Sequence, residues 1–166
     1  MDLNSVAIKA EDRPKRPTDE MKDRAAVKVV DALIKSGYLN AEDRDGAVRE
    51  LMNVGGLWRD GYEIAKELDD RYSWDCSMDM LEYLDRYHYD LHLLVEHAQK
   101  EWAAENNIQP PMEVGTRVNV KGDTGVITGI NEYGAAQFLV AIDGEKDMAG
   151  GTRRRIVNFE DAKAID

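Results

Sequence analysis

The spacing of apolar residues changes at a pair of prolines, Pro110 and Pro111. Before this pair, apolar residues recur three or four positions apart, which predicts amphipathic helices. After it, short runs of alternating apolar and polar residues are separated by glycines, which predicts strands joined by tight turns. We therefore predict an α+β protein with a flexible arm over residues 1–17, a helical domain over 18–109 and a small β-barrel domain over 112–166.

The helical half is predicted to form a bundle of about four helices. Thr18 is a candidate N-cap of the first helix, and Gly37 is expected to end it in the left-handed conformation. A second helix is expected from Asn40 to the glycines that follow residue 54. A third is expected to place Trp58 and Tyr62 on its inner face, before the longest helix begins after residue 77.

The longest predicted helix has an apolar seam that extends over about three heptads. Such a seam is typical of the central helix of a bundle, and the alternative is that it joins two copies as a homodimer. Most aromatic residues of this half are expected in the core, whereas Tyr83 and Tyr89 lie off the seam and could anchor a partner. The seam consists of Met80, Leu84, Tyr87, Leu91, Leu94 or Val95, Ala98 and Trp102.

The β half contains a pattern of a first strand, a glycine turn and a second strand. The residues are VGTRVNV at 114–120, GDTG at 122–125 and VITGI at 126–130. They resemble SH3-like barrels of the KOW type, over roughly residues 112–163. The resemblance implies a closed barrel that binds RNA, DNA or protein, or that serves as a spacer. Taken as a whole, the chain resembles accessory proteins of phages and other mobile elements.

The net charge of −11 is concentrated in the middle of the chain, where residues 38–105 hold −10. This charge disfavours non-specific binding to nucleic acid and to anionic membranes. It indicates either solvated helix faces or an acidic surface for a basic partner. The candidate partner-binding residues of this half are Asp69, Asp70, Asp79, Glu82, Tyr83, Asp85, Tyr89 and Asp90.

Three consecutive arginines, Arg153, Arg154 and Arg155, form the one basic cluster of the predicted barrel. In a strand, Arg153 and Arg155 share a face, where their forked donors could pair with phosphates or carboxylates. The barrel nevertheless carries a net negative charge and few aromatic residues for base stacking. We therefore place protein contact before nucleic-acid binding for Arg153 and Arg155, with a purely structural role as a further alternative.

Two groups could support chemistry. His88, His92 and Glu96 are four residues apart, so they form one ridge of a helix that could hold zinc or iron. The alternative is that this ridge borders the apolar seam and meets solvent, and we predict no metal and no other cofactor. Cys76, the only cysteine, would be a nucleophile only if the fold brought a histidine to it, and it is otherwise a small buried apolar residue.

The sequence predicts a cytoplasmic protein, because it lacks an export signal, a bilayer-length apolar run and a pair of cysteines. No catalytic signature is present, so we expect a non-enzymatic protein-binding or regulatory module. One form of this hypothesis is an inhibitor whose acidic surface occupies a basic nucleic-acid groove. The alternatives are a nucleic-acid-binding accessory protein acting through the barrel and a metal-dependent enzyme using the histidine ridge.

Overall fold

The structure is a computed structural model that describes residues 12–165. Contacts divide the chain into two units. The helical unit comprises Lys15–Val95, and the sheet unit combines the described residues up to Pro14 with those from Glu96 onward. Most of the arm predicted over residues 1–17 lies outside the described residues, so its flexibility stays a prediction.

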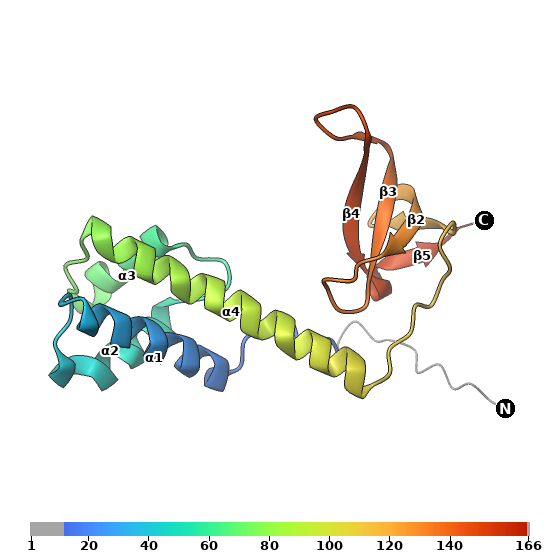
Figure 1. Cartoon of the computed structure of the whole chain (residues 1–166). Coiled ribbons are helices and arrows are strands. Elements are labelled where there is room, and N and C mark those ends of the chain that lie inside the picture. The colour runs from blue at the N-terminus through green and yellow to red at the C-terminus, as the bar shows by residue number, and fades with distance from the viewer. Residues whose placement is uncertain (1–11, 166) are drawn as a thin grey trace. The chain divides into compact units, whose positions relative to one another are not determined.

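The prediction of about four helices is confirmed (Figure 1). The last helix belongs to the helical unit as far as Val95 and continues into the sheet unit. A short 3-10 turn precedes the second helix. The α-helices are α1 (Asp19–Lys35), α2 (Arg44–Val54), α3 (Gly61–Tyr72) and α4 (Met78–Glu105).

Local capping sets the helix boundaries. The Thr18 hydroxyl accepts a hydrogen bond of 3.2 Å from the amide of Met21, as the sequence predicts, and Gly37 has a φ of 81° just beyond α1. At the start of α3, the Asp60 carboxylate accepts from the Glu63 amide and the Glu63 carboxylate accepts from the Asp60 amide. This capping box starts α3 at Gly61. Trp58 is thus left in the preceding loop, and both Trp58 and Tyr62 are exposed, so the prediction that the third helix buries them is wrong.

From Met80 to Val95 the apolar seam of α4 lies in the core of the helical unit, as the sequence predicts for a bundle, whereas Ala98 and Trp102 are half-buried and belong to the sheet unit. Tyr87, at the centre of the seam, is fully buried, and burial raises the pKa of its hydroxyl. Because these side chains already pack within their own chain, they offer little surface to a second copy, and the homodimer stays a prediction without support. The buried seam residues are Met80, Leu84, Tyr87, Leu91 and Val95.

Helix α1 runs antiparallel to α4. Lys28 pairs with Asp90 at 2.8 Å, and about two turns further on, Ser36 at the end of α1 shares a hydrogen bond of 2.9 Å with the Tyr83 hydroxyl. The side chain of Trp74, in the loop between α3 and α4, is anchored by a hydrogen bond of 2.7 Å to the Glu50 carboxylate. These contacts close the bundle around the seam of α4.

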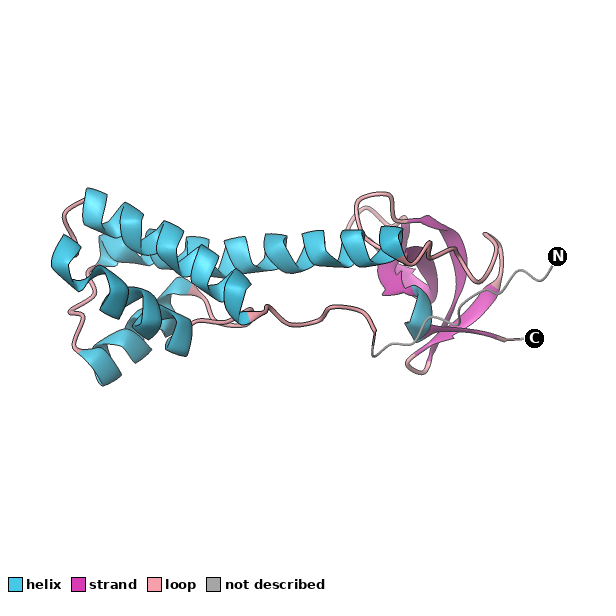
Figure 2. Ribbon diagram, turned by 90° about the horizontal axis from the view of Figure 1, so that it is seen from below, coloured by secondary structure: helices cyan, strands magenta, loops and turns pink. Residues whose placement is uncertain are grey.

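The sheet unit contains a five-stranded antiparallel sheet in the order β4-β3-β2-β1-β5. Figure 1 shows the hairpin of β3 and β4 extending past the other strands, and Figure 2 shows the strands curving around their core. Phe138 and Phe159 meet in this core with ring centroids 4.3 Å apart. The strands are β1 (Arg117–Val120), β2 (Asp123–Ile130), β3 (Gln137–Lys146), β4 (Thr152–Asn158) and β5 (Ala162–Ala164).

The α+β class is confirmed, but the closed barrel is not. Within the described strands, β4 and β5 are the two edges of the sheet and do not pair with each other. The division between the units falls inside α4, earlier in the chain than Pro110–Pro111. That the chain folds as two separate domains joined at these prolines stays a prediction. No helix in the part of the chain that the structure describes is long and apolar enough to cross a membrane.

Candidate protein-binding surface

The beginning of α3 lies directly against α4. The Gly61 amide donates a hydrogen bond of 2.5 Å to the Asp85 carboxylate. A Cβ at position 61 would lie 2.5 Å from the Leu81 carbonyl oxygen, so the close approach of the two helices requires glycine here. A carboxylate at a helix N-terminus is also favoured by the helix dipole. Asp85 therefore holds α3 in place.

The loop before α3 also packs on α4. Nε2 of His92 lies 2.8 Å from the Leu57 carbonyl oxygen, and because a carbonyl only accepts, this nitrogen donates. The Trp58 ring meets the His92 ring edge-on at 6.0 Å, and the His88 and His92 rings are 4.5 Å apart. One side of α4, running from residue 78 to residue 92, thus borders the α3 region along its length.

Three large apolar side chains are exposed along this border. The exposed fractions are 85% for Trp58, 67% for Tyr62 and 79% for Met78. Tyr62 and Met78 both line a pocket of about 240 Å³ between α3 and α4. We call Trp58 and the residues of this pocket the α3–α4 surface. The pocket is lined by Tyr62, Ala65, Lys66, Asp69, Asp70, Cys76, Ser77, Met78 and Leu81.

Cys76 lies in the wall of this pocket and is half-buried. Burial, followed by a hydrogen bond with Asp69, raises the pKa of the Cys76 thiol to about 12. The Asp69 carboxylate also accepts a hydrogen bond of 2.8 Å from the Cys76 amide. A thiol held in the neutral form is a poor nucleophile. The structure thus favours a packing role for Cys76.

We expect Cys76 to react with Ellman's reagent at pH 8 at least about 100-fold more slowly in the folded protein than in urea, because raising a thiol pKa from 9.0 to about 12 lowers its thiolate fraction about a thousand-fold. The rate should rise at higher pH than for an ordinary thiol. Replacing Asp69 by asparagine removes one cause of the shift and should raise the folded-state rate. Equal rates for folded and unfolded protein would contradict this assignment.

The predicted acidic and aromatic residues do not form one surface. Asp69 and Asp70 line the pocket. Asp90 and Tyr83 instead contact α1, and the Tyr83 ring also lies 5.9 Å from that of Tyr38. Because its hydroxyl and its ring already have partners in the bundle, Tyr83 is less available as an anchor than the sequence indicates, and its role in binding stays a prediction.

The other predicted residues of α4 also differ from one another. Asp85 supports α3, so its carboxylate has a structural role. Glu82 forms an exposed ion pair of 3.1 Å with Arg86, one turn along the helix. Asp79 and Tyr89 are exposed, as expected of residues available to a partner.

The two arginines predicted to act together on β4 differ in their surroundings. The Arg155 guanidinium donates to the carboxylate of Asp123 at 2.6 Å and to that of Glu145. These hydrogen bonds raise the pKa of Arg155 further above its ordinary value. Arg153 and Arg154 are exposed, and neither forms an ion pair with another described residue. A paired contact through Arg153 and Arg155 would require Arg155 to leave its partners.

The predicted histidine ridge is engaged in other contacts. His92 donates to the Leu57 carbonyl, and Glu96 pairs with Lys100 at 2.7 Å. His97 lies 3.3 Å from Glu101 on the solvent side. Within residues 12–165, no group of three or more His, Cys, Asp or Glu side chains is arranged to hold a metal ion. These contacts favour the alternative in which the ridge borders the core.

Sequence reasoning missed Trp58, Tyr62 and Met78 as surface residues. A signal was present for Trp58, because Asp60 and Glu63 have the spacing of a capping box. That spacing starts the helix at residue 61 and leaves Trp58 in the preceding loop. Comparison with protein-family models, with curated proteins and with solved structures found no match.

Proposed function

We propose that this chain is a non-enzymatic protein-binding module that contacts a basic partner through the α3–α4 surface. The observation that carries the proposal is the row of three exposed apolar side chains, Trp58, Tyr62 and Met78, along one helix border. Aromatic side chains at the centre of an interface commonly supply much of its binding energy. Tyr62 and Met78 line the same pocket, and exposed apolar residues gathered at one place are more informative than single ones.

The charge of this region indicates the kind of partner. Residues 60–79 hold seven acidic and two basic side chains. Asp69 and Asp70 lie in the pocket wall, beside Tyr62 and Met78. A segment that carries both lysine or arginine and an apolar anchor would fit this combination of charge and shape. A basic nucleic-acid-binding protein is such a partner, which supports the hypothesis of an inhibitor that occupies a nucleic-acid groove.

A binding role is also supported by the state of the candidate catalytic groups. The thiol of Cys76 is held neutral, and Nε2 of His92 is occupied by a carbonyl oxygen. We therefore place binding before metal-dependent catalysis. Because the contact is electrostatic in part, its affinity should fall as the salt concentration rises.

A second candidate is nucleic-acid binding through the sheet unit, which we propose to be related to SH3-like barrels of the KOW type. Its antiparallel strand order supports the relationship. Arg153 and Arg154 lie exposed on the edge strand β4, which favours a contact with phosphates. The net negative charge after residue 105 weighs against this candidate.

The proposal is tested by capturing partners from a lysate of the source cells with matched variants. Tyr62→Ala combined with Met78→Ala should lose the basic proteins that the wild-type chain retains, by at least about tenfold in recovery. Asp70→Lys combined with Asp79→Lys should do the same through charge. Glu113→Lys combined with Glu132→Lys makes an equal charge change at exposed positions of the sheet unit and should leave the recovery unchanged.

The opposite pattern would refute the proposal. If the α3–α4 variants retain the same partners and Arg153→Ala combined with Arg154→Ala loses them, the sheet unit is the contact. Nuclease treatment of the lysate then separates the two candidates, because capture through nucleic acid would disappear with it.

A further inference from the structure

Arg13 is a buried charged residue in an otherwise irregular segment. Only 3% of its surface is exposed, whereas the neighbouring Lys15 and Arg16 are exposed. Burying a charged side chain is costly unless its donors are satisfied. The sheet unit must therefore supply specific partners for this guanidinium.

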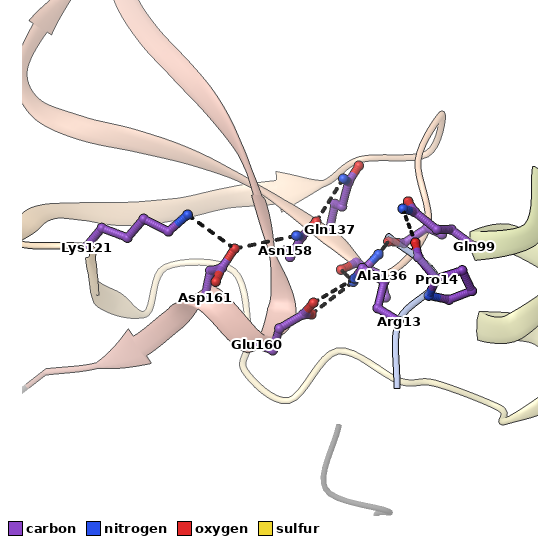
Figure 3. A network of polar contacts seen from close by, with 10 residues as sticks. Arg13, Pro14, Gln99, Lys121, Ala136, Gln137, Asn158, Glu160 and Asp161 are labelled. Atoms are coloured by element: carbon purple, nitrogen blue, oxygen red, sulfur yellow. Dashed lines mark hydrogen bonds and ion pairs between the residues drawn. The ribbon is translucent and has the colours of Figure 1, made fainter. Parts of the chain in front are cut away.

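The guanidinium of Arg13 donates four hydrogen bonds (Figure 3). Nε and Nη2 donate to the two carboxylate oxygens of Glu160 at 2.7 and 3.0 Å. Nη1 donates to the Ala135 carbonyl at 2.6 Å, and Nη2 donates also to the Ala136 carbonyl at 2.9 Å. A planar fork with several donors matches this arrangement, and a lysine ammonium does not.

An aromatic ring and a second polar contact complete the site. The guanidinium carbon of Arg13 lies 5.1 Å from the ring centroid of Trp102, close enough for a cation–π contact. Gln99 donates a hydrogen bond of 2.7 Å to the carbonyl of Pro14, the next residue (Figure 3). The site thus binds an arginine side chain and the carbonyl group of the residue that follows it.

The walls of the site are held by contacts that do not involve Arg13. The Ala136 carbonyl also accepts from the Phe159 amide at 3.0 Å. Gln137 donates to Asn158 at 3.0 Å, which ties the beginning of β3 to the end of β4 (Figure 3). Asn131 donates to Gln137 at 2.9 Å. A site built in advance costs less to fill than one that must be ordered on binding.

The segment around Arg13 is attached to the sheet by side-chain contacts. Among the described residues, no backbone–backbone hydrogen bond joins residues 12–17 to any strand. Residues 13 to 17 also contain two arginine–proline pairs, Arg13-Pro14 and Arg16-Pro17. Arg13 is buried in the site, whereas Arg16 is exposed. Releasing this segment therefore requires one side chain to leave its site and one amide contact to open.

We propose that the sheet unit contains an arginine-recognition site for a segment of a partner protein, and that Arg13 occupies this site within its own chain. The partner would supply an arginine followed by an extended backbone. Because the occupant is tethered, its effective concentration is on the order of millimolar, so a partner competes only with high affinity or with additional contacts. The proposal is independent of the function assigned to the α3–α4 surface.

The test uses the full chain with Arg13→Ala and a labelled synthetic peptide of residues 10–18 that carries Arg16→Lys, so that it has one arginine. Fluorescence anisotropy should show that this peptide binds the variant at least about tenfold more tightly than the wild-type chain, whose site is filled. The matched peptide that also carries Arg13→Lys has the same charge, and it should bind at least about tenfold more weakly, because it lacks the fork.

Two further variants keep the test decisive. Arg13→Lys places a cation in the site without the fork, so it should bind the single-arginine peptide even if Arg13→Ala does not fold. Adding Glu160→Gln to Arg13→Ala should abolish the preference for arginine over lysine. The proposal is overturned if both Arg13 variants bind the peptide no better than the wild-type chain does, or if the arginine and lysine peptides bind equally.

Discussion

Gly55→Ala is expected to lower the free energy of unfolding by about 3 kcal/mol, the upper part of the usual range for overpacking a core. A Cβ at position 55 would lie 2.7 Å from Cδ1 of Tyr87 and closer still to Cε1. It would also lie 2.9 Å from the Leu51 carbonyl oxygen. Tyr87 is fully buried at the centre of the bundle, so its ring has no room to move away.

The neighbouring glycine provides the control. A Cβ at Gly56 would meet nothing within 4 Å, so Gly56→Ala should change the free energy of unfolding by no more than about 0.5 kcal/mol. Urea denaturation of both variants measures the difference directly. Equal stabilities would mean that Tyr87 does not pack against the end of α2 as described.

Asp85→Ala is expected to lower the free energy of unfolding by about 2 kcal/mol, because it leaves the Gly61 amide without its charged acceptor. Glu82→Ala, on the same helix, removes only an exposed ion pair with Arg86 and should cost about 0.5 kcal/mol or less. Thermal or urea unfolding of the two variants separates the structural carboxylate from the solvated one. If Glu82→Ala is the more harmful of the two, Asp85 does not anchor α3.

This difference affects how binding is tested. A variant that reverses Asp79, Glu82 and Asp85 together looks from the sequence like a change of surface charge alone. In the structure, the third change also removes the hydrogen bond that holds the beginning of α3. Loss of binding in such a variant would therefore not identify a contact surface. Asp70 and Asp79 are the better choices, because both are exposed and neither accepts a hydrogen bond from the first amide of a helix as Asp85 does; Asp79 also interacts with the Tyr38 hydroxyl.

The sequence predicts most of the secondary structure because it is encoded locally. Thr18 caps α1 through its own hydroxyl, and Gly37 supplies the positive φ that follows the helix. The alternation after residue 115 likewise places β1 and β2 to within a few residues. Closure of the barrel is not encoded locally, because it depends on pairing between strands that are far apart in the chain.

The proposed binding surface is harder to predict because it depends on tertiary contacts. Tyr83 and Tyr89 are both off the seam of α4, but only the fold shows that Tyr83 contacts the residues just after α1. Arg153 and Arg155 share a strand face by alternation, and only the fold shows that Asp123 and Glu145 bind Arg155. Arg13 lies in a segment that reads as a free arm, and its partner Glu160 is far along the chain.

Hydrogen exchange of the chain, alone and bound to its captured partner, tests the central claim most directly. The loops at residues 55–60 and 73–77 border the α3–α4 surface. In these loops the amides of Trp58, Trp74 and Asp75 donate no hydrogen bond to another described residue, so they should exchange quickly in the free chain. We expect the partner to slow exchange in both loops and to leave β1 to β5 unchanged. Protection confined to β4 and the loop before it, with both helical loops unaffected, would contradict the account.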